Sequence, residues 1–314
     1  MSDEGVLDPL VAEWIAANPM YAAPLEDFTP EILELARGPV GGPPTREIAD
    51  VVDDTVGAVP VRFYRHAEVP TGLVVYFHGG GHVMGSIGIM DNVAREIAHA
   101  SGAAVISVEY RLAPEHPFPE GLDDCEAVAR WALAHAADFD TAPDLVTVAG
   151  ESAGGNLSAA VALRLRDAGI TSLAGQALLY PGVAAGAEFP SEVEFDGLIR
   201  SRKAAELNWQ AYAGGRDISR DPYAAPLYAE TLAGLPPALV VLGGCDMLRD
   251  EGRAYAARLR DDGVDVTEVC FAGQPHGFLN LNLPAAATAY EQIGSWLRAI
   301  FARAAQTTER EGAR

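Results

Sequence analysis

The chain has 314 residues, 49% of them hydrophobic, and a formal net charge of -22 with a single lysine, Lys203. This length suits one α/β domain with insertions, and the hydrophobic content is enough to bury a large core. Nucleic acids and anionic membranes bind clustered Lys and Arg side chains, so the charge argues against both as partners.

The N-terminus, Met1-Ser2-Asp3-Glu4, lacks the basic region of a secretory signal, and no apolar run reaches membrane-spanning length. Three cysteines are present, Cys125, Cys245 and Cys270, and none of them forms a CxxC pair. An odd number of cysteines without such pairs fits a reducing compartment. We therefore expect a cytoplasmic protein.

Two helices are expected before the first strand. Apolar residues recur at helical spacing over residues 6–15, which predicts an amphipathic helix with a buried face. Thr29 followed by Pro30 marks the start of a second helix, with the proline at the first helical position. We interpret residues 1–45 as an appendage to a domain that occupies residues 46–314.

From residue 61 onwards, apolar strand candidates alternate with helical candidates. The strand candidates are 61–64, 73–77, 103–108, 145–149, 177–180, 239–242 and 266–271. The helical candidates are 91–100, 122–136, 153–166, 247–261 and 285–304. This alternation implies a mostly parallel sheet with helices on both faces, so the predicted fold class is α/β.

The alternation lapses between the strand candidates 177–180 and 239–242. A helical candidate around 201–212 lies in this stretch, together with the aromatic residues Trp209 and Tyr212. A long insertion in a compact domain is usually functional or disordered, and the aromatic residues argue against disorder. We expect part of it, at about 185–220, to act as a lid.

The strand candidate 145–149 ends at a serine between glycines, in the order Gly150-Glu151-Ser152-Ala153-Gly154. In a GxSxG elbow the nucleophile is held on a strained turn, and the glycines keep neighbouring side chains from colliding. A chance match is not rare in a chain with 32 glycines, so Ser152 needs partners.

A nucleophilic serine requires an imidazole to take its proton and a carboxylate to orient that imidazole. His276 follows the last strand candidate, and Asp246 follows the preceding one. Asp250 and Glu251 are rival acids, but they belong to the expected first turn of a helix, where the dipole alone favours acids. The Ser, Asp, His order is that of α/β-hydrolases, so we predict a triad of Ser152, Asp246 and His276.

The tetrahedral intermediate of acyl transfer carries a negative oxygen that fixed donors stabilise. The run His-Gly-Gly-Gly at 78–81 follows a strand candidate, and its glycines let the backbone approach a substrate closely. We predict the amides of Gly79 and Gly80 as oxyanion donors, with the amide of Ala153 as the third.

Together these motifs resemble those of the hormone-sensitive-lipase-like group of α/β-hydrolase esterases, over about residues 60–300. The runs that carry the resemblance are His78–Gly81, Tyr110–Pro119, Gly150–Gly155, Asp246–Glu251 and His276–Phe278. The resemblance implies an eight-stranded core sheet and a helical cap built from residues 1–45 and the insertion. It also implies that no metal or organic cofactor is needed, and that esters of short to medium acyl chains are preferred.

Two positions depart from the family pattern. Glu151 stands where relatives often carry Asp or Thr, and Met247 replaces a frequent proline. Neither change removes a catalytic atom. His78 and His82 lack an acidic or cysteine partner at ligand spacing, so we expect no metal site.

The sequence therefore predicts a serine carboxylesterase that acts on small-molecule esters. Amide hydrolysis or deacetylation by the same triad is an alternative; a non-catalytic receptor of this fold is another, and the presence of His276 argues against it. Trp209, Phe278 and Tyr180 are candidate substrate-binding walls, with core packing as their alternative role. The last strand would leave an edge through which a homodimer can form.

Overall fold

A computed structural model describes residues 5–19, 27–38, 42–66 and 68–312. One eight-stranded sheet forms its centre, in the order β1-β2-β4-β3-β5-β6-β7-β8. The strands are β1 (Asp50–Val56), β2 (Val59–Arg65), β3 (Leu73–Phe77), β4 (Ala104–Val108), β5 (Val146–Glu151), β6 (Leu173–Leu179), β7 (Ala238–Cys245) and β8 (Val266–Pro275). The first two pairings are antiparallel and the others are parallel. The predicted fold class and strand number are confirmed.

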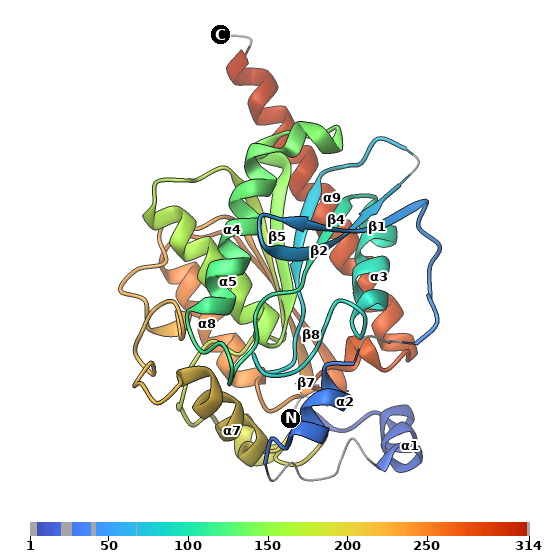
Figure 1. The fold of residues 1–314 in the computed structure, drawn as a ribbon, viewed down its shortest axis with the longest axis vertical. Helices are drawn as coiled ribbons and strands as arrows, with labels where there is room; N and C mark the ends of the chain where they lie inside the picture. Colours follow the sequence, from blue (N-terminus) through green and yellow to red (C-terminus); the bar gives the residue numbers. More distant parts are fainter. Residues whose placement is uncertain (1–4, 20–26, 39–41, 67, 313–314) are drawn as a thin grey trace.

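Helices cover both faces of the sheet (Figure 1). On one face α3 (Asp91–Ser101) packs against α9 (Pro284–Gly312), and on the other lie α4 (Glu120–Ala134), α5 (Ala153–Asp167) and α8 (Arg249–Asp261). Because both faces are covered, every residue of β3 is buried. Val74 belongs to the core beneath α3 and α9, whereas Val75 belongs to the core beneath α4 and α5. Successive side chains of the strand therefore point to opposite faces of the sheet and pack in two separate cores.

The strand β1 was not among the predicted strands. It pairs with β2 at the edge of the sheet, and only Val56 of its residues is buried. An edge strand with three aspartates lacks the apolar pattern by which strands are recognised. Among the predicted elements, β6 begins earlier than expected and α9 continues further, to Gly312.

The two expected N-terminal helices are present as α1 (Pro9–Ala17) and α2 (Pro30–Ala36). Asp8 and Thr29 cap them by accepting hydrogen bonds from backbone N–H groups of the first turns. Within the predicted N-terminal section 1–45, residues 1–4, 20–26 and 39–41 lie outside the described residues. Both helices lie at the same end of the molecule as α7 (Arg202–Ala213), at the bottom of Figure 1.

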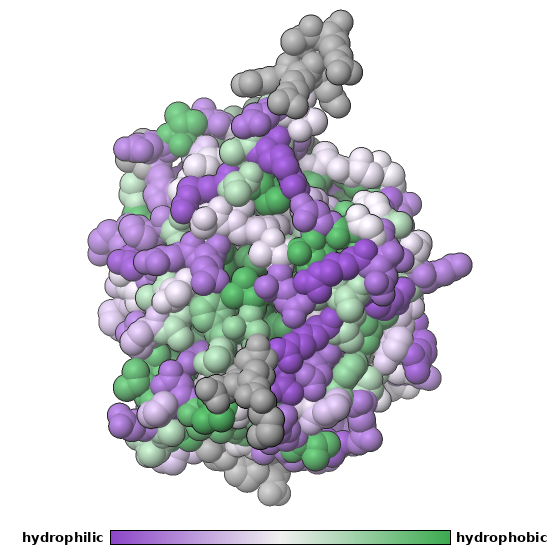
Figure 2. Space-filling model, turned by 180° about the vertical axis from the view of Figure 1, so that it is seen from behind, coloured by the Kyte–Doolittle hydropathy of each residue, from purple (hydrophilic) through white to green (hydrophobic). Residues whose placement is uncertain are grey.

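Figure 2 shows hydrophilic residues interspersed with hydrophobic ones over the face opposite to that of Figure 1. Across the described ranges, no helix combines the length and the apolar character that crossing a membrane requires.

A short helix, α6 (Pro190–Glu194), and the loop that follows it lead into α7. These elements fall within the predicted insertion at about 185–220, between β6 and β7.

Candidate active site

Ser152 occupies a strained turn between β5 and α5. Its φ of 57° and ψ of -116° lie in a region that a residue with a side chain rarely adopts. Its backbone N–H donates to Leu179 O at 2.8 Å, which helps to hold the turn. A Cβ atom on Gly154 would lie 1.9 Å from Phe77 O, so only glycine permits the close approach of α5 to β3. The elbow thus has the geometry that the glycine spacing predicts.

The structure brings the three predicted triad side chains together. Ser152 Oγ lies 2.9 Å from His276 Nε2, and His276 Nδ1 lies 2.9 Å from Asp246 Oδ2. Each residue directly follows a parallel strand, namely β5, β7 or β8, and parallel strands end at a common edge of the sheet. Asp246 is buried, and its other carboxylate oxygen accepts from Leu248 N at 2.8 Å. The carboxylate is thereby fixed in the orientation that meets the imidazole.

The rival acids point elsewhere. Asp250 pairs with Arg249 at 2.8 Å and accepts from Ser191 N at 3.0 Å. Glu251 Oε1 accepts hydrogen bonds from two backbone N–H groups, those of Val183 and Ala184. Both acids lie in the first turn of α8, as expected.

Glu251 is almost fully buried, and this burial raises its pKa to about 8. Glu192 adds to the increase, whereas the two backbone N–H groups and Arg200 oppose it. The side chain therefore enters the neutral pH range mostly protonated.

The predicted oxyanion donor Gly79 needs correction. Its backbone N–H donates a 2.8 Å hydrogen bond to Glu151 Oε1, so this amide already has an acceptor. In the described part of the chain, the amides of Gly80, Gly81 and Ala153 make no hydrogen bond. Gly81, which the sequence analysis left out, lines the same cavity as Ser152. The free donors of the loop are therefore displaced by one residue from the prediction.

Glu151 is the residue whose role the sequence did not reveal. Its side chain is buried, which raises its pKa, while the Gly79 N–H and His276 favour the charged form. The spacing of the motif gave no signal of this contact, because 72 positions separate the two partners. A glutamate beside the nucleophile can reach the loop after β3 only once β3 and β5 pair in the sheet.

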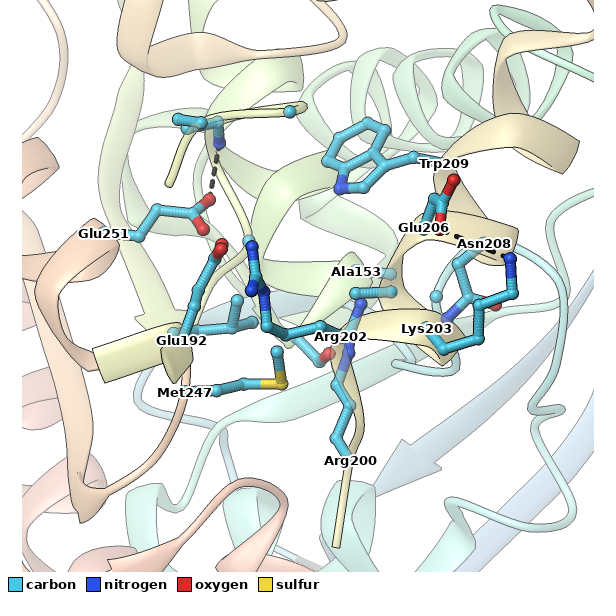
Figure 3. Close-up of a pocket in the computed structure, with 18 of the residues that line it drawn as sticks. Ala153, Glu192, Arg200, Arg202, Lys203, Glu206, Asn208, Trp209, Met247 and Glu251 are labelled. Atoms are coloured by element: carbon cyan, nitrogen blue, oxygen red, sulfur yellow. Dashed lines mark hydrogen bonds and ion pairs between the residues drawn. The ribbon is translucent and has the colours of Figure 1, made fainter. Parts of the chain in front are cut away.

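A cavity of about 680 Å³ has Ser152 in its lining, and Figure 3 shows other residues that line it, Ala153 and Trp209 among them. Its volume lies in the range of small-molecule binding sites. Gly81 and Ala153 line it on the side of the free amides, and the half-buried Trp209 lines it from α7. Trp209, predicted as a substrate-binding wall, thus lies in the lining of the cavity, and its role in binding stays a prediction.

The other two predicted walls do not line this cavity. Tyr180 and Phe278 are buried in the core beneath α3 and α9. The Tyr180 ring meets the His276 ring edge to face at a centroid distance of 5.2 Å, so it supports the imidazole from behind. Core packing, the alternative role, therefore describes both residues.

The histidines of the loop after β3 are packed against aromatic rings. His78 stacks on Tyr110 at 4.3 Å, and His82 stacks on Tyr212 at 3.7 Å. Burial lowers the pKa of His82 to about 3, with Arg200 and His78 as smaller causes. Among the described residues, no group of three or more His, Cys, Asp or Glu side chains is arranged to hold a metal ion.

Comparisons with known proteins agree with this geometry. A family described as the alpha/beta hydrolase fold matches residues 74–280. Carboxylesterase NlhH of Mycobacterium tuberculosis is 42% identical over 245 residues, which cover 75% of this chain and 76% of that protein. Esterase LipI of the same organism is 36% identical and covers 84% of this chain and 85% of its own length.

A solved structure, the hyperthermophilic esterase of the archaeon Pyrobaculum calidifontis, superposes with a TM-score of 0.84. It is 34% identical, with 94% of this chain and 98% of that chain covered. Sequence and structural similarity therefore extend beyond the catalytic motifs to most of the fold. The chain belongs to the α/β-hydrolase family, within its hormone-sensitive-lipase-like group of esterases.

Proposed function

We propose that the protein is a serine carboxylesterase that hydrolyses small-molecule esters through an acyl-enzyme. One observation carries the proposal: two consecutive 2.9 Å contacts link Ser152 to His276 and His276 to Asp246 beside a cavity. The names of the similar proteins, which are esterases, support the same reaction class.

In the proposed mechanism, the Ser152 hydroxyl donates its proton to His276 Nε2 as Oγ attacks the ester carbonyl carbon. Asp246 accepts from Nδ1–H and stabilises the imidazolium that forms. The tetrahedral intermediate collapses, His276 gives the proton to the leaving alcohol, and the acyl group stays on Ser152. Water then attacks the acyl-enzyme with His276 again as base, which releases the carboxylic acid and restores the serine.

The negative oxygen of each intermediate requires donors that are already in place. We assign this role to the amides of Gly80, Gly81 and Ala153, since the Gly79 amide is engaged with Glu151. The loop is held from behind by Tyr110, whose hydroxyl donates to His78 O at 2.7 Å. A fixed loop costs no reorganisation when the charge develops.

We further propose that residues 1–45 and the insertion at about 185–220 together form a cap over the catalytic domain. Arg37, at the end of α2, supports this assignment because it donates to Val83 O and to Ala113 O and pairs with Glu115 at 2.9 Å. A cap that narrows the cavity favours short to medium acyl chains. The cytoplasmic location and the homodimer stay predictions from the sequence.

The proposal is tested with the Ser152→Ala variant and p-nitrophenyl butyrate. We expect turnover to fall by several orders of magnitude, because the nucleophile is removed. Ser158→Ala is a matched control, since it deletes a buried hydroxyl elsewhere in α5, which donates to Gly154 O. A fluorophosphonate should label wild-type protein and spare Ser152→Ala; full turnover by Ser152→Ala would overturn the proposal.

A further inference from the structure

Arg200 lines the cavity, and its guanidinium has no hydrogen-bond or ion-pair partner among the described residues. It lies directly before Ser201, the N-cap of α7, and lines the same cavity as Ser152 and Ala153 (Figure 3). Within the described ranges its guanidinium forms no hydrogen bond and no ion pair, and its Nε atom is buried without a partner. The family motifs of the sequence give no role to this residue.

The other cations at the cavity are already paired. Arg202 forms an ion pair with Glu188, and Lys203 lies 3.3 Å from Glu206. Arg200 also has acidic neighbours. The charges of Asp246, Glu251 and Glu192 act on its guanidinium from a distance and oppose the decrease in its pKa. In the part of the chain that the structure describes, none of those carboxylates pairs with the Arg200 guanidinium: Asp246 is engaged with His276, and Glu251 accepts from two backbone N–H groups. Among the described cations that line this cavity, Arg200 is therefore the one whose guanidinium N–H groups are free to donate to a ligand.

An unpaired guanidinium near the protein interior is unfavourable. Burial lowers the pKa of Arg200, yet an arginine does not lose its proton in a protein, so the charge stays, and a carboxylate within hydrogen-bond distance would stabilise it further. The residue before it, Ile199, has a φ of 125°, which is strained for a β-branched side chain. Such strain persists where the surroundings impose it, and it is common at ligand clamps.

We infer that Arg200 binds a carboxylate carried by the ester substrate, so that the enzyme prefers acidic esters such as half-esters of dicarboxylic acids. This inference rests on the proposed esterase function and names its substrate class. A guanidinium offers a planar fork of donors that fits a carboxylate in bidentate fashion. The carboxylate of Glu192 also lines the cavity and disfavours a ligand with two negative charges, so a carboxylate fits better than a phosphate.

The test compares two esters of equal acyl length, mono-p-nitrophenyl glutarate and p-nitrophenyl pentanoate. The readout is the ratio of kcat/KM for the acidic ester to that for the neutral ester. We expect Arg200→Gln to lower this ratio about tenfold or more, as the loss of a hydrogen bond to a charged group predicts. Arg200→Lys should keep part of the ratio. Arg202→Gln is the matched control, because its guanidinium is already paired with Glu188.

A second pair of esters locates the carboxylate on the substrate. 4-Acetoxybenzoate carries it on the alcohol side, and 4-methylphenyl acetate is its neutral counterpart. Loss of selectivity in Arg200→Gln for the first pair assigns Arg200 to the acyl side, and loss for the second pair assigns it to the alcohol side. Unchanged ratios for both pairs overturn the inference.

Folding of the variants is checked by circular dichroism. Should Arg200→Gln fail to fold, inhibition of the wild-type enzyme by glutaramate, which carries one carboxylate, replaces it. Glutaramate should then inhibit hydrolysis of p-nitrophenyl pentanoate more strongly than the neutral pentanediamide does, and equal inhibition contradicts the inference. The proposed function is tested separately. It would be wrong if Ser152→Ala still hydrolysed the neutral ester at the wild-type rate.

Discussion

Glu151 Oε1 accepts a 2.8 Å hydrogen bond from the Gly79 backbone N–H, which joins the residue beside Ser152 to the loop that holds the proposed oxyanion donors. Because of this contact, the Gly79 N–H is already engaged and is not among the proposed donors. A Cβ atom on Gly79 would lie 2.6 Å from a Glu151 oxygen, so the two positions depend on each other. The departure from the family pattern at Glu151 thus has a structural consequence.

Replacing Glu151 with alanine should leave the buried Gly79 N–H without an acceptor. An unsatisfied buried donor costs about 1–3 kcal/mol, so we expect a loss of that order in the free energy of unfolding. The loosened loop should also lower kcat for p-nitrophenyl butyrate. Glu151→Gln retains an oxygen that accepts from Gly79 and should stay closer to wild type in both respects. Urea unfolding and steady-state kinetics measure the two effects; equal damage in both variants would show that the charge matters instead.

Gly80 should be intolerant of a side chain. Its φ is 119°, and a Cβ atom there would lie 2.1 Å from the backbone oxygen of Met84. Gly80→Ala should therefore displace a proposed oxyanion donor, and the loss of one such donor costs on the order of 2.7–4 kcal/mol in transition-state stabilisation. We expect kcat to fall more than KM changes, because the donor acts in the transition state.

Gly169→Ala is the control for Gly80→Ala. Gly169 also has a positive φ, 77°, but a Cβ atom there meets nothing within 4 Å. Both variants carry backbone strain, and only one disturbs the site. A kcat reduced equally in both would mean that strain, and not the lost donor, explains the effect.

Much of the fold follows from local patterns in the sequence. The buried strands β3, β4 and β5 are short apolar runs, and Ser152, Asp246 and His276 directly follow β5, β7 and β8. Parallel pairing then brings strand ends to one edge, which explains why chain position alone placed the three side chains together. The exposed edge strand β1 carries no comparable pattern.

The rest of the site depends on contacts between distant segments. The direction of the Gly79 amide follows from Glu151, and the burial of Tyr180 and Phe278 follows from the packing of α3 and α9 on the sheet. The sequence does not distinguish an aromatic side chain that lines a cavity from one that packs in the core. The lack of a partner for the Arg200 guanidinium also depends on tertiary structure, since it depends on where the fold places the acidic side chains of other elements.

Stability should fall with rising pH through the titration of Glu251. Its folded pKa, about 8, lies above the ordinary value of 4.5, so between these values the folded state holds a proton that the unfolded state releases. The contribution is therefore fully present below about pH 4.5 and is lost as the pH rises towards 8. The greatest slope that one group can give is about 1.4 kcal/mol per pH unit.

Glu251→Gln isolates this contribution, because its amide oxygen can still accept from Val183 and Ala184. Urea unfolding at pH 5, 6, 7 and 8 gives the free energy of unfolding of both proteins. We expect the variant to lose less stability than the wild type over this range. Parallel pH profiles would mean that Glu251 does not titrate between the two states as its burial implies.

Trp209 should limit the length of the acyl chain. Its half-buried ring lines the cavity from α7 and lies 5.7 Å from the His82 ring, so Trp209→Ala enlarges the cavity beside a fixed wall. Each further buried methylene contributes about 0.8 kcal/mol, or roughly fourfold in kcat/KM. We expect the ratio of kcat/KM for p-nitrophenyl octanoate to that for the butyrate to rise in this variant. Trp131→Ala, in α4 and away from the cavity, is the control for general loss of packing. The same ratio in both variants would place the limit on acyl length elsewhere in the insertion.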